Sequence, residues 1–108
     1  VRLREAMMAH PELVAGETRA CTELMRAAPG VALKTGAEAV FTAIIPSKKL
    51  GIAIKVEDGA FRASEALITA LLVKMGFLND QHPSALRRLG PIYNWDGLQT
   101  GHIEVTLV

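Results

Sequence analysis

The sequence is poor in the residues that mark several classes of protein. Its 108 residues include a single cysteine, Cys21, which excludes an internal disulfide and a cysteine-rich zinc site. One cysteine is typical of a protein from a reducing compartment, and we expect the cytoplasm. No run of about 18 apolar residues occurs, so we also expect no membrane-spanning helix.

Net charge and aromatic residues are scarce as well. Twelve Lys and Arg face eleven Asp and Glu, which gives a net charge of +1, and 5% of the residues are aromatic. A nucleic-acid-binding protein normally concentrates its basic side chains on one face. The doublets Lys48-Lys49 and Arg87-Arg88 are too short for such a face. We therefore expect no nucleic-acid partner.

Apolar residues make up 50% of the chain, which is too many for a disordered protein. The length fits a single domain or a piece of one. Val1 opens the chain inside a helical pattern that ends at His10, before Pro11. We therefore expect residues 1–108 to be one segment of a longer protein.

The periodicity of the apolar residues predicts an α+β fold. A second helix is expected over 18–28, with Thr18 as its N-cap. Three short runs with strand-forming residues follow, and their short connections favour an antiparallel meander flanked by helices. The predicted strands cover residues 31–36, 39–45 and 50–56.

A long helix is predicted over 60–75, with Asp58 as its cap. It is apolar on most sides, with only a thin polar stripe of Arg62, Glu65 and Thr69. A helix of this kind needs cover on most sides, so we expect protein outside this chain to pack against it. A short helix over 83–89 and a last strand around Ile103, Val105 and Leu107 complete the prediction.

Lys34-Thr35-Gly36 is the first candidate for chemistry. An apolar strand delivers an amine, a hydroxyl and a glycine in succession, and we expect the strand to desolvate the Lys34 ammonium partly. Such a lysine can stabilise developing negative charge, or act as a base once it has lost its proton. The glycine would let a ligand or another backbone approach closely. A strand that simply ends in solvent is the competing interpretation.

Cys21 is the second candidate, although its apolar helix face suits a buried core residue equally well. A cysteine nucleophile normally needs a histidine base. His10, His82 and His102 lie beside Pro or Gly in predicted loops, at spacings that suggest neither a base nor a metal site.

Familiar nucleophile motifs do not occur. None of the serines is followed by a lysine three residues later, and there is no G-x-S-x-G turn or phosphate-binding loop. The adjacent acids Glu57-Asp58 suit a helix cap better than a two-carboxylate site. The residues of this chain therefore supply at most part of an active site.

Ordered blocks of sequence resemble the asparaginase II family, the zinc-containing type of L-asparaginase. They cover nearly the whole chain and are 10–16, 19–25, 32–38 and 50–59, followed by Asn94-Trp95-Asp96-Gly97 and Thr100-Gly101-His102-Ile103. Ala39 departs from the pattern, since a glycine is common at that place in the family.

The resemblance implies hydrolysis of L-asparagine to L-aspartate and ammonia, on a fold similar to serine β-lactamases and glutaminases. The family uses Ser-Lys pairs, and its strand lysine lies in a K-T-G element that Lys34 matches. Cys21 matches a family cysteine near the active site, and Thr35, Gly36 and Glu38 fall in the same block. The segment would then be the C-terminal third of a catalytic domain.

The nucleophilic serines of the family have no match here, nor do the two cysteines and the lysine that bind its zinc. We therefore expect no metal or cofactor site within this chain, with zinc bound by upstream residues of the full-length protein. The isolated chain should be inactive, and its partners should be the missing N-terminal part and a second copy in a homodimer.

Two alternatives to the enzyme remain open. The segment could be a non-catalytic ligand- or protein-binding module built on the same fold, and the missing nucleophile favours that. A penicillin-recognising relative would also carry K-T-G, but the blocks around His10–Gly16 and Cys21 argue against it.

Overall fold

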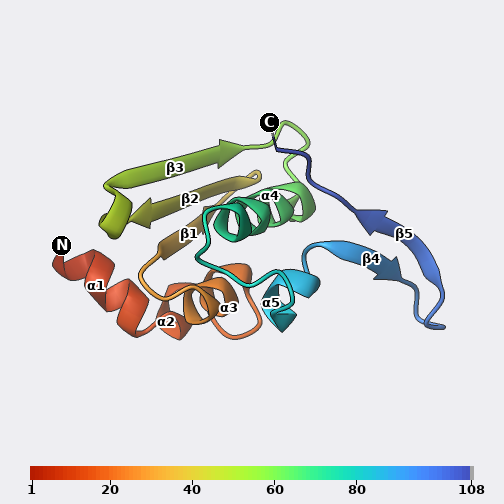
Figure 1. The fold of residues 1–108 in the computed structure, drawn as a ribbon, viewed down its shortest axis with the longest axis horizontal. Helices are drawn as coiled ribbons and strands as arrows, with labels where there is room; N and C mark the ends of the chain where they lie inside the picture. The colour runs from red at the N-terminus through yellow and green to blue at the C-terminus, as the bar shows by residue number, and fades with distance from the viewer. Residues whose placement is uncertain (108) are drawn as a thin grey trace.

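The computed structural model describes residues 1–107, and its helices and strands follow one another as drawn in Figure 1. The elements are α1 (Arg2–Ala9), α2 (Glu12–Ala15), α3 (Ala20–Ala27), β1 (Ala32–Gly36), β2 (Val40–Ile45), η1 (Pro46–Lys48), β3 (Leu50–Lys55), α4 (Phe61–Lys74), α5 (Pro83–Leu86), β4 (Gly90–Tyr93) and β5 (Gln99–Ile103).

Three of the strands form the antiparallel meander predicted from the sequence. Their order is β1-β2-β3, and the register pairs Leu33 with Ala43 and Phe41 with Ile54. Pro46 ends β2 because it lacks the N–H that a continuing ladder would need. The α+β class and the position of the sheet are therefore confirmed.

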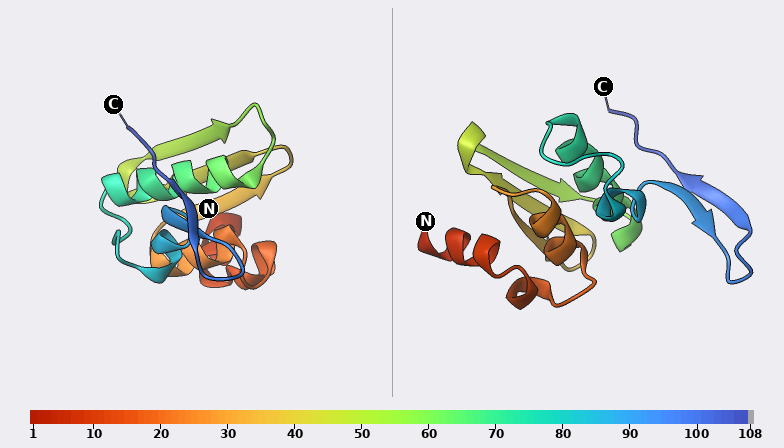
Figure 2. Two further views of the ribbon diagram at one scale, coloured as in Figure 1. Left: turned by 90° about the vertical axis from the view of Figure 1, so that its right-hand side faces the viewer. Right: turned by 60° about the horizontal axis from the view of Figure 1, so that its bottom comes forward.

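One face of this sheet is covered by α3, which packs on β1, and by α4, which packs on β2 and β3 (Figure 2). Alternation along the strands directs one set of side chains into this layer. Each large side chain removed from water there stabilises the fold by about 1.5–3 kcal/mol. The largest fully buried ones are Phe41, Leu24, Leu33, Ile45, Ile68 and Leu72.

Both predicted helix caps are wrong. Thr18 has a left-handed backbone, with φ of 64°, and α3 begins two residues later with Arg19 as its N-cap. Asp58 accepts a hydrogen bond at 2.9 Å from the N–H of Ala60, which is itself the N-cap of α4. Asp58 therefore shapes the turn before the helix instead of capping it.

The chain covers α4 better than its composition suggested. Only Phe61, Arg62 and Lys74 of this helix are exposed. Thr69, predicted to lie in a polar stripe, is fully buried and donates a hydrogen bond at 2.6 Å to the carbonyl of Glu65. The prediction that most of the helix would lack cover within these residues is therefore wrong.

The C-terminal part forms a β-hairpin, β4 paired antiparallel with β5, that projects from the rest of the molecule (Figure 1). The Asn94 side chain shapes the turn by accepting hydrogen bonds at 3.0 Å from the N–H groups of Asp96 and Leu98. The predicted last strand is wrong in extent, since β5 ends at Ile103, and β4 was not predicted.

Within residues 1–107, every helix is too short or too polar to cross a membrane.

Candidate functional site

The site is built on β1, which carries Lys34, Thr35 and Gly36 in succession. Leu33 points into the core and is fully buried, so the alternation of a strand places Lys34 on the opposite face. Across the hairpin, the Thr42 hydroxyl donates a hydrogen bond at 3.2 Å to the carbonyl oxygen of Lys34. The K-T-G tripeptide is the end of β1, paired with β2 as far as Gly36, and Lys34 is exposed, so the competing interpretation of a strand end beside solvent stands next to the catalytic one.

Helix α3 brings Cys21 against this strand. The backbone N–H of Thr35 donates a hydrogen bond at 3.1 Å to Cys21 Sγ. The two residues are 14 positions apart in the chain, and an apolar helix face and a strand edge meet at this bond. The structure thus brings together two of the candidates that the sequence offered separately.

Burial raises the pKa of the Cys21 thiol above its ordinary value. The hydrogen bond from the Thr35 N–H and the nearby charge of Lys34 act in the opposite direction, but burial dominates. A thiol is a poor nucleophile because the thiolate is the reactive form. Cys21 therefore suits a packing and hydrogen-bonding role better than covalent catalysis.

Lys34 is exposed, so the expected desolvation of its ammonium by the strand is wrong for the residues described. Its Nζ donates a hydrogen bond at 2.5 Å to the carbonyl oxygen of Thr35. The amine is therefore open to a polar ligand on the exposed face of β1, whereas the Thr35 N–H is already paired with Cys21 Sγ.

Gly36 has a packing role within the hairpin. A Cβ built on it would lie 3.2 Å from Cβ and 3.3 Å from Cγ1 of Val40, its partner across the turn. The close neighbour is thus a side chain of β2, and the predicted approach of a ligand is not needed to explain the glycine.

The hairpin turn between β1 and β2 holds Glu38 and Ala39 in the left-handed region, each with φ of 58°. Glycine adopts this region without the steric cost that a Cβ brings, which is a physical reason for glycine where Ala39 stands. The Glu38 carbonyl accepts a hydrogen bond at 2.5 Å from Lys55 Nζ, and its side chain is exposed at the tip.

The three histidines contact partners other than Cys21. His82 Nδ1 accepts a hydrogen bond at 3.1 Å from the N–H of Ser84 and so caps α5. His10 and His102 are exposed and lie near Glu12 and Glu104. In the part of the chain that the structure describes, no three His, Cys, Asp or Glu side chains are grouped to hold a metal, so these residues do not fit a zinc site.

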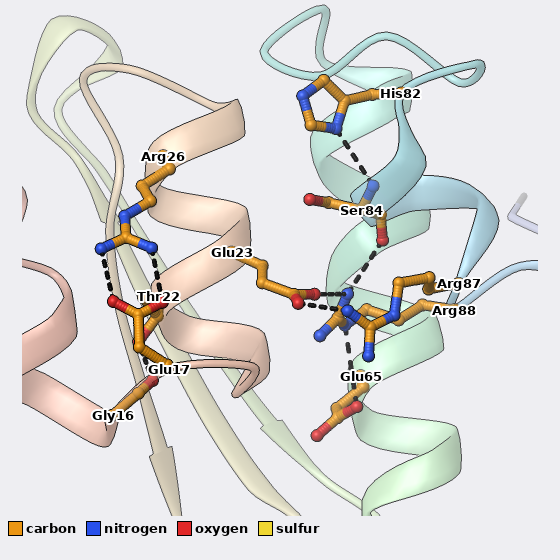
Figure 3. A network of polar contacts seen from close by, with 10 residues as sticks. All are labelled: Gly16, Glu17, Thr22, Glu23, Arg26, Glu65, His82, Ser84, Arg87 and Arg88. Carbon is orange, nitrogen blue, oxygen red and sulfur yellow. Dashed lines mark hydrogen bonds and ion pairs between the residues drawn. The ribbon is translucent and has the colours of Figure 1, made fainter.

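A partly buried ion network that sequence reasoning missed joins α3 and α4 to the residues that directly follow α5 (Figure 3). Glu23 of α3 contacts both Arg87 and Arg88, and Arg88 Nε lies 3.7 Å from Glu65 Oε2 of α4. Arg88 is 7% exposed. The sequence carries no local signal for this network, because Glu23 and Arg88 are 65 residues apart.

The sequence model of the family described as L-asparaginase II matches residues 1–105, which is almost the whole chain. A comparison with curated protein sequences gave no match. The matched range includes β1, Cys21 and the projecting hairpin, and this protein therefore belongs to the L-asparaginase II family.

Proposed function

We propose that this chain is the C-terminal part of an L-asparaginase that converts L-asparagine and water to L-aspartate and ammonia. Family membership supports an asparaginase-type amidohydrolase. One observation carries the assignment to this site: the bond between Cys21 Sγ and the Thr35 N–H, which joins the two family blocks beside Lys34.

The proposed reaction uses a serine outside this chain as nucleophile. Its Oγ attacks the side-chain amide carbon of asparagine, and the hydroxyl proton passes to a nearby amine. The C–N bond then breaks, and the departing nitrogen takes up a proton and leaves as ammonia. Water hydrolyses the resulting ester, which gives aspartate and restores the serine.

Lys34 is the residue of this chain that acts in the reaction. As a neutral amine it would take the serine proton, and as an ammonium it would stabilise negative charge or donate to the leaving nitrogen. Solvent reaches the amine in the residues described, so the remaining wall of the site comes from upstream residues. The Thr35 N–H joins β1 to Cys21, and Gly36 packs closely against Val40 of β2. Glu38 is the last residue of the sequence block 32–38 that resembles the family.

The order of elements supports a β-lactamase-like plan. A helix is followed by the strand with Lys34, by two more antiparallel strands and by a long helix across the sheet. In this proposal the zinc ligands and the catalytic serines lie upstream, and the protein is a cytoplasmic homodimer.

Ammonia release from L-asparagine by the full-length protein tests the proposal. Lys34→Met removes the amine at nearly constant length and should lower the rate by about 10²–10⁴-fold, as loss of a general base does. Lys34→Arg separates the two roles, because a guanidinium stays protonated and rescues only charge stabilisation. Lys49→Met, an exposed lysine in a turn, is the matched control.

Near-native turnover in Lys34→Met, with unchanged folding stability, would remove Lys34 from the mechanism. Absence of any ammonia release by the wild-type protein would favour the non-catalytic binding module instead.

A further inference from the structure

Lys55, the last residue of β3, lies on the same face of the sheet as Lys34. The register places Gly36, Val40 and Lys55 in one row across the three strands. Because Gly36 follows Lys34 by two residues on β1, the alternation of a strand directs Lys34 and Lys55 to one face. Lys55 is exposed, and the proposed reaction does not use it.

The Lys55 ammonium joins two segments of backbone. Its Nζ donates hydrogen bonds at 2.5 Å to the carbonyl oxygen of Glu38 and at 2.9 Å to the carbonyl oxygen of Val56. Glu38 lies in the turn between β1 and β2, and Val56 directly follows β3. A charged donor makes such bonds stronger than bonds between neutral groups. We call this pair of hydrogen bonds the Lys55 clamp.

The turn has a backbone conformation that needs support. Glu38 and Ala39 both lie in the left-handed region, which costs free energy for any residue with a Cβ. Such conformations persist where the surrounding contacts impose them. The carbonyl of the fully buried Ala39 accepts a hydrogen bond at 3.3 Å from the N–H of Val56. The segment that follows β3 therefore supports the turn together with the clamp.

The position of β1 depends on this turn because β1 is an edge strand. It pairs with β2 on one side only. On its other edge, the Thr35 N–H is bonded to Cys21 Sγ. The turn begins directly after Gly36, so a shift of the turn displaces the end of the strand that carries Lys34. A displacement of about 1 Å in a catalytic group can cost about 10²-fold in rate.

We propose that Lys55 is a positioning residue for Lys34 and acts by holding the turn between β1 and β2. This inference rests on the proposed function, since Lys34 is the group that is positioned. Without the Lys55 amine, the Glu38 carbonyl loses its charged donor and the turn is free to shift. The Lys34 amine then meets the serine and the substrate in a productive geometry less often.

Hydrogen–deuterium exchange of the full-length protein, followed by mass spectrometry, tests the Lys55 clamp without an activity assay. Lys55→Met should raise amide exchange in peptides from 34–41 by about tenfold, because it removes two charge-assisted hydrogen bonds and so favours local opening. Peptides from α4 should keep their exchange rates. Lys55→Arg keeps a charged donor and should restore most of the protection, and Lys49→Met, an exposed lysine just before β3, should exchange like the wild type.

Unchanged exchange over 34–41 in Lys55→Met would overturn the proposal. An equal rise in the α4 peptides would also overturn it, because the effect would then be a general loss of stability.

Kinetics of ammonia release connect the clamp to Lys34. Lys55→Met should lower kcat by about tenfold and change KM by less than about twofold, since the interaction lost acts in the transition state. In a Lys34→Met background, Lys55→Met should lower kcat no further, because the positioned amine is gone. A loss of folded protein would instead lower kcat by the same factor in both backgrounds.

Near-native kcat in Lys55→Met, or the same fold-loss in both backgrounds, would overturn the positioning role while leaving the proposed function intact. Absence of ammonia release by the wild-type protein would refute the proposed function and the role toward Lys34 together. The exchange experiment would still decide whether Lys55 holds the turn.

Discussion

Glu23→Gln should destabilise the protein through the ion network between α3 and the residues that follow α5. The substitution keeps the shape of the side chain and removes the charge that faces Arg88. The two side chains of that pair are 17% and 7% exposed, so water can replace little of the lost interaction. Arg88 would keep the Ser84 carbonyl at 3.0 Å and Glu65 at 3.7 Å.

Removing one partner of a buried ion pair costs about 3–5 kcal/mol, because the other charge remains buried. The glutamine oxygen still accepts a hydrogen bond, and Glu65 still offsets part of the charge. The exposed partner Arg87 adds at most about 1 kcal/mol. We therefore expect Glu23→Gln to lower the free energy of unfolding by about 2–4 kcal/mol.

Urea unfolding of the full-length protein, followed by circular dichroism, measures this loss. Arg26→Gln is the control, since it breaks an ion pair with Glu17 whose side chains are 48% and 65% exposed and should cost less than about 1 kcal/mol. The double variant Glu23→Gln/Arg88→Gln should lose less than the sum of its single variants, with a coupling of about 1–3 kcal/mol. A loss in Glu23→Gln no larger than in the control would refute the reasoning.

Three further predictions concern the strand, the thiol and the isolated chain. Gly36→Ala should destabilise the protein by about 1–3 kcal/mol in the same urea assay, because the new Cβ crowds Val40. Gly51→Ala is the control and should cost less than about 1 kcal/mol, since the nearest atom to its new Cβ is 4.0 Å away; equal losses would contradict the crowding. Because burial raises the pKa of the Cys21 thiol, the unfolded state loses the thiol proton at a lower pH than the folded state. Stability should therefore fall as the pH rises above 9.0, the ordinary pKa of a cysteine, and Cys21→Ala should lack that part of the fall. Parallel pH profiles of stability in the two proteins would contradict this prediction. The 108-residue chain alone should release no ammonia from asparagine, because the proposed nucleophilic serine lies outside it, and measurable activity would contradict this. It should also self-associate, since Tyr93, Trp95 and Leu98 are all exposed on the projecting hairpin, and a monodisperse monomer in light scattering would contradict that.

Local sequence determined the central sheet and the extent of its strands. Val, Ile and Phe alternate with smaller or polar residues, Pro46 stops one strand, and the short connections permit only antiparallel neighbours. The same local signals placed α4 within one residue at each end. These features depend on neighbours in the chain, which is why a pattern in the sequence could predict them.

Helix starts and the hairpin were harder to predict because packing decides them. Thr18 is a good capping residue by type, but the chain turns through a left-handed conformation there and α3 starts later. Strand β4 contains Gly90 and Pro91, which the sequence pattern treats as breakers. Pairing with β5 nevertheless makes it a strand.

In the candidate site too, the sequence predicted individual residues and the tertiary structure decided their contacts. The sequence singled out Lys34 and Cys21 separately, and a resemblance between blocks of sequence related them, but only the tertiary structure placed Cys21 Sγ on the Thr35 N–H. It alone also buried Arg88 beside Glu23. Residues so distant in the chain leave no periodic signal, because their contact is decided by how α3, α4 and α5 pack together.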